Sequence, residues 1–135
     1  MAAERTLAII KPDAVKKNLT GKIIAHLEEA GFVVREMWMT RLTEAEARRF
    51  YEVHAERPFY QSLVVFMSSD RCVPMVLERK SAVSALRETI GATDPARAAE
   101  GTIRSLFAES VERNAIHASD SLENAAREIE FFFPE

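Results

Sequence analysis

Short apolar segments alternate along this chain with stretches of helical periodicity, and few folds accommodate that order. Four segments are rich in strand-forming residues, namely residues 5–10 (RTLAII), 32–41 (FVVREMWMTR), 72–78 (CVPMVLE) and 114–117 (NAIH). Pro12 stops the first of them, which we expect to be a buried strand. Pro74 lies inside the third, and because proline cannot donate a hydrogen bond, this strand is predicted to lie at an edge or to carry a bulge.

Hydrophobic residues recur at spacings of three and four between and after these strands. The spacing predicts helices with apolar faces at residues 23–30, 47–54, 63–67, 83–90, 103–107 and 122–129. Capping signals mark several starts: residues 43–46 (TEAE) form a capping box, Ser81 precedes one helix, and Asp120 or Ser121 precedes the last. Residues 91–102 form a long loop of small residues, and such loops are usually functional or disordered.

The resulting order of elements is β-α-β-(αα)-β-α-β-α, which indicates the α+β class. We predict a ferredoxin-like α/β sandwich, in which helices pack on one face of a four-stranded, mostly antiparallel sheet. No internal repeat, low-complexity tract or linker interrupts the pattern. Residues 1–135 are therefore expected to form one domain.

The composition limits the partners and the compartment of the chain. Its 18 basic and 21 acidic residues leave a formal charge of −3, which argues against a general nucleic-acid or membrane surface. The lone cysteine, Cys72, cannot form an internal disulfide, so a reducing compartment is expected. The apolar run at residues 7–10 is too short for a secretory signal or a membrane span. We therefore expect a cytoplasmic protein.

One histidine lies where the fourth predicted strand gives way to the last helix. His117 is followed by hydroxyl and carboxylate side chains in residues 114–121 (NAIHASDS). A histidine that attacks phosphorus needs one neutral ring nitrogen free and the other held by a fixed acceptor. Glu128, on the last helix, could fold back and be that acceptor. The alternative is that His117 is a core histidine with satisfied hydrogen bonds and Glu128 a solvated helix residue.

Three cations lie at points where a phosphate group could be held. Lys11 ends the first strand, Arg87 projects from the helix at residues 83–90, and Arg104 follows the long loop. Thr93 and the loop amides could add neutral donors. The alternative is that these cations only solvate the surface, which is weakest for the lysine because it ends an apolar strand. Neither GxxxxGK[ST] nor GxGxxG occurs, which excludes a Walker or Rossmann phosphate loop.

Other kinds of site fit the residues poorly. His117, Ser119 and Asp120 are the residue types of a catalytic triad, but neighbours in sequence do not build its geometry, and GxSxG is absent. The histidines lack HExxH or Cys/His spacing, so a protein-bound transition metal is not expected. Phe59 is either a core residue or an exposed ring on which a base stacks, and residue type alone favours the core.

Four motifs in this order resemble the nucleoside diphosphate kinase family. They are TLAIIKPDAV at residues 6–15, YEVHAERPFY at 51–60, ALRETIGATDPARAAEGTIR at 85–104 and NAIHASDSLENAAREI at 114–129. Residues 114–120 correspond to the family's N-x-x-H-x-S-D signature, and residues 91–104 to its phosphate-side loop. The resemblance extends from about residue 4 to the last residue. It favours the functional interpretation of His117, Glu128 and Phe59.

The resemblance implies a ping-pong phosphotransferase. A nucleoside triphosphate such as ATP would give its γ-phosphoryl group to His117, and a nucleoside diphosphate would then take it from the phosphohistidine. Glu128, with Ser119 beside it, is expected to hold the ring of His117 in one tautomer. Mg²⁺ is expected as the cofactor, carried on the nucleotide phosphates, with few or no direct protein ligands.

The resemblance also implies nucleotide-binding positions and an assembly. The positions are Lys11, Tyr51, which would position Lys11, His54, Phe59, Arg87, Thr93, Arg104, Val111 and Asn114. Lys11 and Arg104 would hold the transferring and β-phosphates, and Arg87 and Thr93 the inner phosphates. Asn114 and Lys11 would meet the ribose 3′-hydroxyl, and Phe59 and Val111 would sandwich the base. The expected partners are nucleoside di- and triphosphates and further copies of the chain, as a tetramer or hexamer built from dimers. Neither a membrane nor a specific nucleic acid is expected.

Some positions depart from the family pattern. Asp70 and Arg71 replace the usual Gly-Pro, Arg79 replaces a glycine after the third strand, and Ala118 replaces the glycine beside the histidine. Ala118 would strain the site if its backbone had a positive φ, because a Cβ penalises that conformation. Two alternatives therefore stay open: a catalytically silent ferredoxin-like module that binds nucleotide or RNA, and a purely structural oligomer subunit.

Overall fold

One antiparallel sheet lies at the centre of the molecule. The structure is a computed structural model, and it describes residues 3–134. Its strands are β1 (Glu4–Ile10), β2 (Val33–Met37), β3 (Val73–Arg79) and β4 (Ile116–Ala118). They lie in the order β2-β3-β1-β4, and every pairing is antiparallel. The predicted α+β class and four-stranded sheet are thus confirmed.

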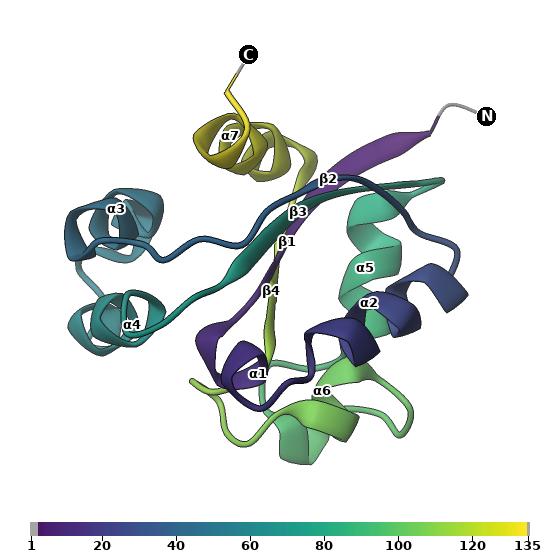
Figure 1. The fold of residues 1–135 in the computed structure, drawn as a ribbon, viewed down its shortest axis with the longest axis horizontal. Helices are drawn as coiled ribbons and strands as arrows, with labels where there is room; N and C mark the ends of the chain where they lie inside the picture. Colours follow the sequence, from purple (N-terminus) through teal and green to yellow (C-terminus); the bar gives the residue numbers. More distant parts are fainter. Residues whose placement is uncertain (1–2, 135) are drawn as a thin grey trace.

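Helices cover both faces of this sheet, whereas one covered face was predicted. The α-helices are α1 (Pro12–Lys16), α2 (Thr20–Glu29), α3 (Glu44–Phe50), α4 (Tyr60–Met67), α5 (Ala82–Ile90), α6 (Ile103–Phe107) and α7 (Leu122–Phe132). Two short 3₁₀ helices, η1 (Glu52–His54) and η2 (Pro95–Arg97), complete the described elements. Figure 1 shows α2, α5 and α6 on one side of the sheet and α3, α4 and α7 on the other.

The central strand β1 explains why both faces are covered. Successive side chains of a strand point to opposite faces. Ala8 and Ile10 pack into the core beneath α2 and α5, while Leu7 and Ile9 pack into a second core with α3, α4 and α7. All four are fully buried. The continuous apolar run at residues 7–10 is therefore the pattern of a strand buried on both faces.

Pro74 lies in an interior strand, so the predicted edge position of β3 is wrong. β3 pairs with β1 on one side and with β2 on the other. The Pro74 carbonyl accepts a hydrogen bond from the backbone N–H of Trp38, just after β2 ends. The proline ring therefore faces the end of the β2 ladder, where a missing N–H costs one terminal bond. A register shift does occur in this pairing, but it lies between Val34 and Glu36.

Element boundaries differ from the predictions where short-range signals are weak. β2 covers Val33–Met37 rather than residues 32–41, although an isolated bridge joins Thr40 to Cys72. β4 covers Ile116–Ala118 rather than residues 114–117. The helix α1 was not predicted, because its five residues are too few to show a periodicity.

The caps of α3 and α7 are confirmed, and that of α5 is not. Thr43 and Glu46 form both bonds of a capping box, each at 3.0 Å. The Ser121 side chain accepts a hydrogen bond from the backbone N–H of Asn124 at the start of α7. Ser81 makes no capping bond, and the Glu4 carboxylate from β1 accepts the Val83 N–H at 2.8 Å instead.

Between residues 3 and 134, no helix combines the length and the apolar character needed to cross a bilayer.

Candidate functional site

One cavity of about 490 Å³ collects the predicted site residues. It lies where the end of β1, strand β4, the loop after α5 and the segment between α3 and α4 come together. All the predicted site residues except Ser119 line it, namely Lys11, Tyr51, His54, Phe59, Arg87, Thr93, Arg104, Val111, Asn114, His117 and Glu128. These residues come from segments far apart in sequence, so the fold itself assembles the site.

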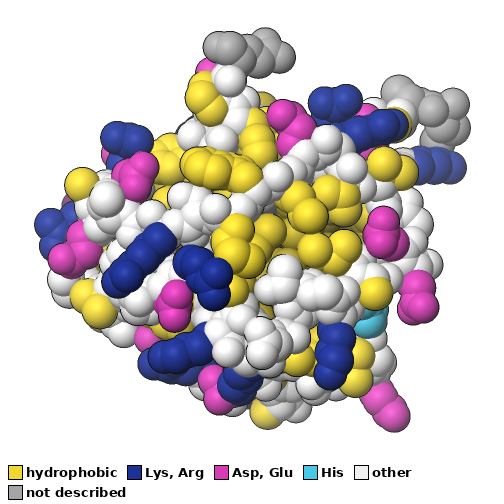
Figure 2. Space-filling model, viewed as in Figure 1, with side chains coloured by type: hydrophobic (Ala, Val, Ile, Leu, Met, Phe, Trp, Pro, Cys, Tyr) yellow, Lys and Arg dark blue, Asp and Glu magenta, His cyan; other side chains and the backbone are white. Residues whose placement is uncertain are grey.

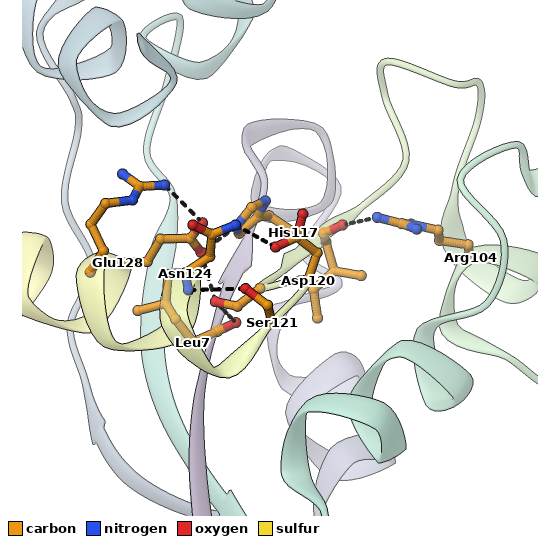
Figure 3. Close-up of polar contacts among 10 residues, drawn as sticks. Leu7, Arg104, His117, Asp120, Ser121, Asn124 and Glu128 are labelled. Atoms are coloured by element: carbon orange, nitrogen blue, oxygen red, sulfur yellow. Dashed lines mark hydrogen bonds and ion pairs between the residues drawn. The ribbon is translucent and has the colours of Figure 1, made fainter. Parts of the chain in front are cut away.

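His117 is held at its Nε2 atom and packed at its ring edges. It lies on β4 opposite Ile9 of β1, and its side chain is 19% exposed. Nε2 lies 2.8 Å from the Glu128 Oε1 (Figure 3). The rings of Phe50 and Tyr51 meet it edge-on, with centroids at 5.5 and 6.0 Å. Nδ1 is then the ring nitrogen that has no hydrogen bond to the rest of residues 3–134.

Glu128 is buried and carries two hydrogen bonds on one oxygen. The Ser119 hydroxyl donates to Oε1 at 2.7 Å, beside the contact from His117. Burial by itself would raise the pKa of Glu128, but the hydrogen bond and charge of His117, with the Ser119 bond and the Arg127 charge, outweigh it and hold the pKa below its usual value. Ser119 therefore lies behind the cavity wall and acts on His117 through Glu128.

Lys11 ends β1 inside the cavity and is buried. Its Nζ donates to the Asn114 Oδ1 at 2.8 Å, and its backbone N–H donates to the Ala115 carbonyl. Burial lowers the pKa of Lys11 to about 8, and the positive charge of Arg104 acts in the same direction. The ammonium group therefore lies where an anionic ligand would stabilise it.

Arg104 is a second buried cation, aimed by backbone carbonyls. Its Nη2 donates to the Ile116 carbonyl at 2.7 Å (Figure 3). Its Nη1 donates to the Gly91 carbonyl at 3.1 Å. Its Nε is buried without a partner in the described part of the chain. Burial lowers the pKa of Arg104 to about 10, and the neighbouring charge of Arg87 adds to this.

The loop after α5 brings Thr93 to the cavity and has structure of its own. Gly91 has a φ of +89°, and a Cβ there would come within 2.5 Å of the Thr102 hydroxyl oxygen, so only glycine fits. Asp94 caps η2 by accepting the N–H of Ala96. The Thr93 carbonyl accepts a hydrogen bond from the Asn114 amide at 3.2 Å. The loop thus ties Asn114 to the cavity wall.

The outer end of the cavity is apolar. Phe59 and Val111 are 47% and 56% exposed, so the core position that residue type favours for Phe59 is wrong. The ring of Phe59 lies 5.4 Å from that of His54. Burial lowers the pKa of His54, and the charges of Arg57 and His117 contribute.

Tyr51 lies deeper in the wall. Its hydroxyl is buried without a hydrogen-bond partner in residues 3–134, so in this structure it does not bind Lys11. Burial raises the pKa of this hydroxyl, and the negative charge of Glu128 adds to the rise.

Asp13 is a supporting residue that the sequence reasoning did not find. Its Oδ2 accepts the backbone N–H of Ala115 at 3.1 Å, and both residues are buried. Ala115 has a φ of +73°, which is costly for a residue with a Cβ. This bond holds the strained residue between Asn114 and β4. An acidic residue directly after Pro12 was the only local signal.

The residues that depart from the family pattern do not strain the backbone beside His117. Ala118 is in β4 and is not among the described residues with positive φ, so the predicted strain there is wrong. The Arg79 Nη1 donates to the Ala30 carbonyl at 2.9 Å. Asp70 accepts the backbone N–H of Arg71 in an exposed turn. Of the residues that depart from the family pattern, Asp70, Arg71 and Arg79 do not line the cavity.

Other unpredicted residues complete the lining. Glu112, Asp120, Asn124 and Arg127 all contribute to the cavity wall. The Ser62 hydroxyl of α4 donates to the Glu112 carboxylate at 2.6 Å, which links the two sides of the cavity mouth. Asp120 was noted in the sequence only as a possible cap and as part of the family signature. No sequence pattern marked the other three, because polar residues on helices and loops are most often solvated.

Chemically, the cavity suits a phosphorylated ligand with a flat apolar group. The buried Lys11 and Arg104 and the exposed Arg87 supply positive charge to the cavity, where the Nδ1 of His117 has no hydrogen bond to the rest of residues 3–134. Exposed apolar side chains lie at the outer end. Cations and a held imidazole are what phosphoryl transfer through histidine requires.

Comparison with known proteins identifies the family. The family model for nucleoside diphosphate kinase matches residues 4–135. The nucleoside diphosphate kinase of Chlorobium chlorochromatii is 59% identical over 96% of this chain and 93% of its own, and that of Gluconobacter oxydans is 58% identical over 100% and 96%. A crystal structure of the Aquifex aeolicus enzyme is 47% identical, with a TM-score of 0.95 over 98% of this chain and 96% of its own. The chain therefore belongs to the nucleoside diphosphate kinase family of phosphotransferases.

Proposed function

We propose that the chain transfers the γ-phosphoryl group of a nucleoside triphosphate to a nucleoside diphosphate by way of His117. The observation that carries the proposal is the His117 ring, held at Nε2 by Glu128 in one cavity with Lys11 and Arg104. In the first step Nδ1 attacks the γ-phosphorus, the bond from that phosphorus to the bridging oxygen breaks, and the nucleoside diphosphate leaves. In the second step the terminal phosphate oxygen of another diphosphate attacks the phosphohistidine and frees the ring.

The hydrogen bonds on Glu128 support the choice of nitrogen. An ionised carboxylate accepts, so the tautomer with a proton on Nε2 is favoured and the lone pair stays on Nδ1. Ser119 holds the same carboxylate oxygen and limits its rotation. When the ring becomes phosphorylated, the carboxylate also balances the positive charge that develops on it.

The cations and the cavity mouth support the substrate class. Lys11 and Arg104 would stabilise the charge on the transferring and β-phosphates, and Arg87 and Thr93 would bind the inner phosphates. Asn114, already bonded to Lys11, would meet the ribose 3′-hydroxyl. The residues proposed to bind the transferring phosphates, the inner phosphates and the ribose all line one cavity.

The exposed apolar pair at the mouth supports a broad choice of base. Phe59 and Val111 would sandwich the base between them. Because every base has a π-face, stacking alone discriminates weakly between bases. Tyr51 and His54 would line the space between the base and the phosphates.

Mg²⁺ fits this site as a companion of the nucleotide. Residues 3–134 hold no cluster of three or more His, Cys, Asp or Glu side chains spaced for a metal ion, while phosphate oxygens are ligands that Mg²⁺ prefers. Asp120 is the exposed carboxylate of the cavity wall that could approach such an ion through water. The ion would supply neutralisation of the phosphate charge.

The exposed edge of the sheet supports a homo-oligomer, which we propose to be a tetramer or hexamer built from dimers. β2 is an edge strand, and Val33, Met37, Trp38 and Met39 along and after it are each about half exposed. Figure 2 shows hydrophobic side chains gathered at the centre of the face on which Figure 1 places β2. An unpaired apolar edge is stabilised by pairing with a second copy.

We propose further that residues 1–135 act as one kinase domain in the cytoplasm. The supporting observation for the compartment is chemical. Cys72 is a buried free thiol. As the one cysteine of the sequence it can form no disulfide within the chain, which suits a reducing compartment.

Labelling with [γ-³²P]ATP tests the reaction. The protein should acquire label that is lost in acid, survives base, and is discharged by ADP or GDP. The variant His117→Ala should acquire no label while keeping the circular dichroism spectrum of the unmodified protein. His26→Ala is the matched control, because His26 lies outside the cavity and its side chain hydrogen-bonds the Gly101 carbonyl.

The labelling assay, together with a measurement of ADP binding, separates the alternatives. A folded protein that binds ADP but never acquires label would be the silent binding module. A folded protein that neither binds ADP nor acquires label would be the structural subunit. Either result contradicts the proposal.

A further inference from the structure

Arg127 is a charged residue of the cavity wall for which the reaction above has no use. It lies on α7 next to Glu128, lines the cavity, and its side chain is 37% exposed. Its Nη2 lies 3.5 Å from the Glu128 Oε2. An exposed ion pair at this distance contributes little to stability. A role for Arg127 is therefore sought in the chemistry of Glu128 and His117.

The two oxygens of Glu128 have different partners. Oε1 accepts from both His117 and Ser119, at 2.8 and 2.7 Å. Oε2 has one charged neighbour in the structure as described, which is Arg127. The carboxylate is otherwise buried, so this guanidinium is the cation closest to the negative charge on the side away from His117.

A cation at this position acts on the whole Glu128–His117 pair. It stabilises the carboxylate, and it disfavours a second positive charge on the imidazole ring. The ring must be neutral to attack phosphorus. A carboxylate without such a cation would bind a protonated ring more strongly, which would remove the nucleophile as the pH falls.

The other charges around the pair come from other elements. Lys11 follows β1, Arg104 lies on α6 and Arg87 on α5, and all three line the cavity, where Lys11 and Arg104 are buried and Arg87 is exposed. His54 of η1 and Asp120 before α7 also line the cavity; the lowered pKa of His54 favours its neutral form, so Asp120 contributes a negative charge. Tyr51 is uncharged when buried. Bound phosphates would neutralise the charges of Lys11, Arg87 and Arg104. Arg127 is then the cation that persists beside Glu128 during the reaction.

We propose that Arg127 is a positioning residue that keeps the Glu128–His117 pair in the state with an ionised carboxylate and a neutral, nucleophilic ring at neutral pH. This inference rests on the proposed function. Arg127 touches neither the ring nor, in this proposal, the nucleotide, and it acts through Glu128.

The test is the pH dependence of phosphoenzyme formation in a single turnover. Arg127→Gln should lower the rate at pH 6 by roughly three- to tenfold and leave the rate at pH 8.5 within about twofold, since a charge at this distance corresponds to about half to one unit on the pH axis. Arg127→Lys should restore most of the rate at pH 6. The acid side of the profile therefore moves to higher pH only when the charge is lost.

Arg48→Gln is the matched control. Arg48 on α3 forms a similar exposed pair with Glu44, at 3.7 Å, and lies outside the cavity. Its replacement should leave the profile unchanged. An unchanged profile for Arg127→Gln, or the same loss of rate at every pH, would overturn the inference. Failure of the proposed function is distinct, because the unmodified protein would then form no phosphoenzyme at any pH.

Discussion

Lys11 and Arg104 are ionisable side chains that the cavity shields from water, and this shielding favours the binding of an anion. Burial lowers the pKa of Lys11 to about 8 and that of Arg104 to about 10. Their charged forms are only partly solvated inside the cavity. An anionic ligand replaces the missing solvation, so part of the cost of burying these cations returns as binding free energy.

The shifted pKa of Lys11 predicts that nucleotide binding weakens at alkaline pH. An ordinary lysine stays charged up to about pH 10.5, whereas Lys11 loses its proton as the pH rises through about 8. The dissociation constant for ADP, measured by calorimetry, should rise by up to about tenfold between pH 7 and pH 9. Lys11→Arg should bind ADP with no such rise, because a guanidinium keeps its proton. A flat profile for the unmodified protein between pH 7 and 9.5 would contradict this prediction.

At the scale of elements, each functional side chain is placed by the end or the inner face of one element. Lys11 follows the last residue of β1, His117 lies at the middle of β4, and Glu128 lies on the inner face of α7. Ser121 fixes where α7 begins and so sets which of its residues face β4. The pairing of β4 with β1 then brings Lys11 and His117 to one cavity.

The cap of α5 makes a prediction about stability. Glu4 accepts the Val83 N–H, whereas Ser81, which has a φ of +53°, makes no capping bond. Glu4→Ala should lower the free energy of unfolding by about 1 kcal/mol, since it removes a charged cap at a helix N-terminus. Ser81→Ala is the control and should change it by less than about 0.5 kcal/mol. Urea unfolding measures both, and equal losses would refute the assignment of the cap.

At the scale of the whole molecule, the sheet separates two cores and leaves one apolar edge uncovered. One core lies under α2 and α5, and the other under α3, α4 and α7. The cavity lies at the end of the sheet where β1 stops. The exposed side chains of β2 lie outside both cores. The surfaces that we propose for catalysis and for assembly are therefore built from different elements.

This separation predicts that assembly can be disrupted without loss of the fold. Trp38→Glu places a charge in the apolar surface beside β2, which should shift the mass measured by size-exclusion chromatography with light scattering toward that of one chain. Leu122→Glu is the control, because Leu122 is more exposed still but lies at the start of α7. If Trp38→Glu keeps the mass of the unmodified protein, β2 is not the interface.

Local patterns were sufficient for those parts of the molecule that depend on neighbours in sequence. The apolar run at residues 7–10, the capping box at Thr43 and the Ser121 cap each involve residues within four positions of one another. The approach of Glu128 to His117 was also predictable, because only eleven positions separate them and about two turns of α7 lie between.

Contacts between distant segments were decided by the tertiary structure. Glu4 caps a helix 79 residues away, Asp13 supports Ala115 across 102, and Pro74 is tolerated in an interior strand because β2 ends beside it. Helices on both faces of the sheet have the same origin. Periodicity and capping report the conformation of one segment, whereas which segments meet depends on the free energy of burying all of them together.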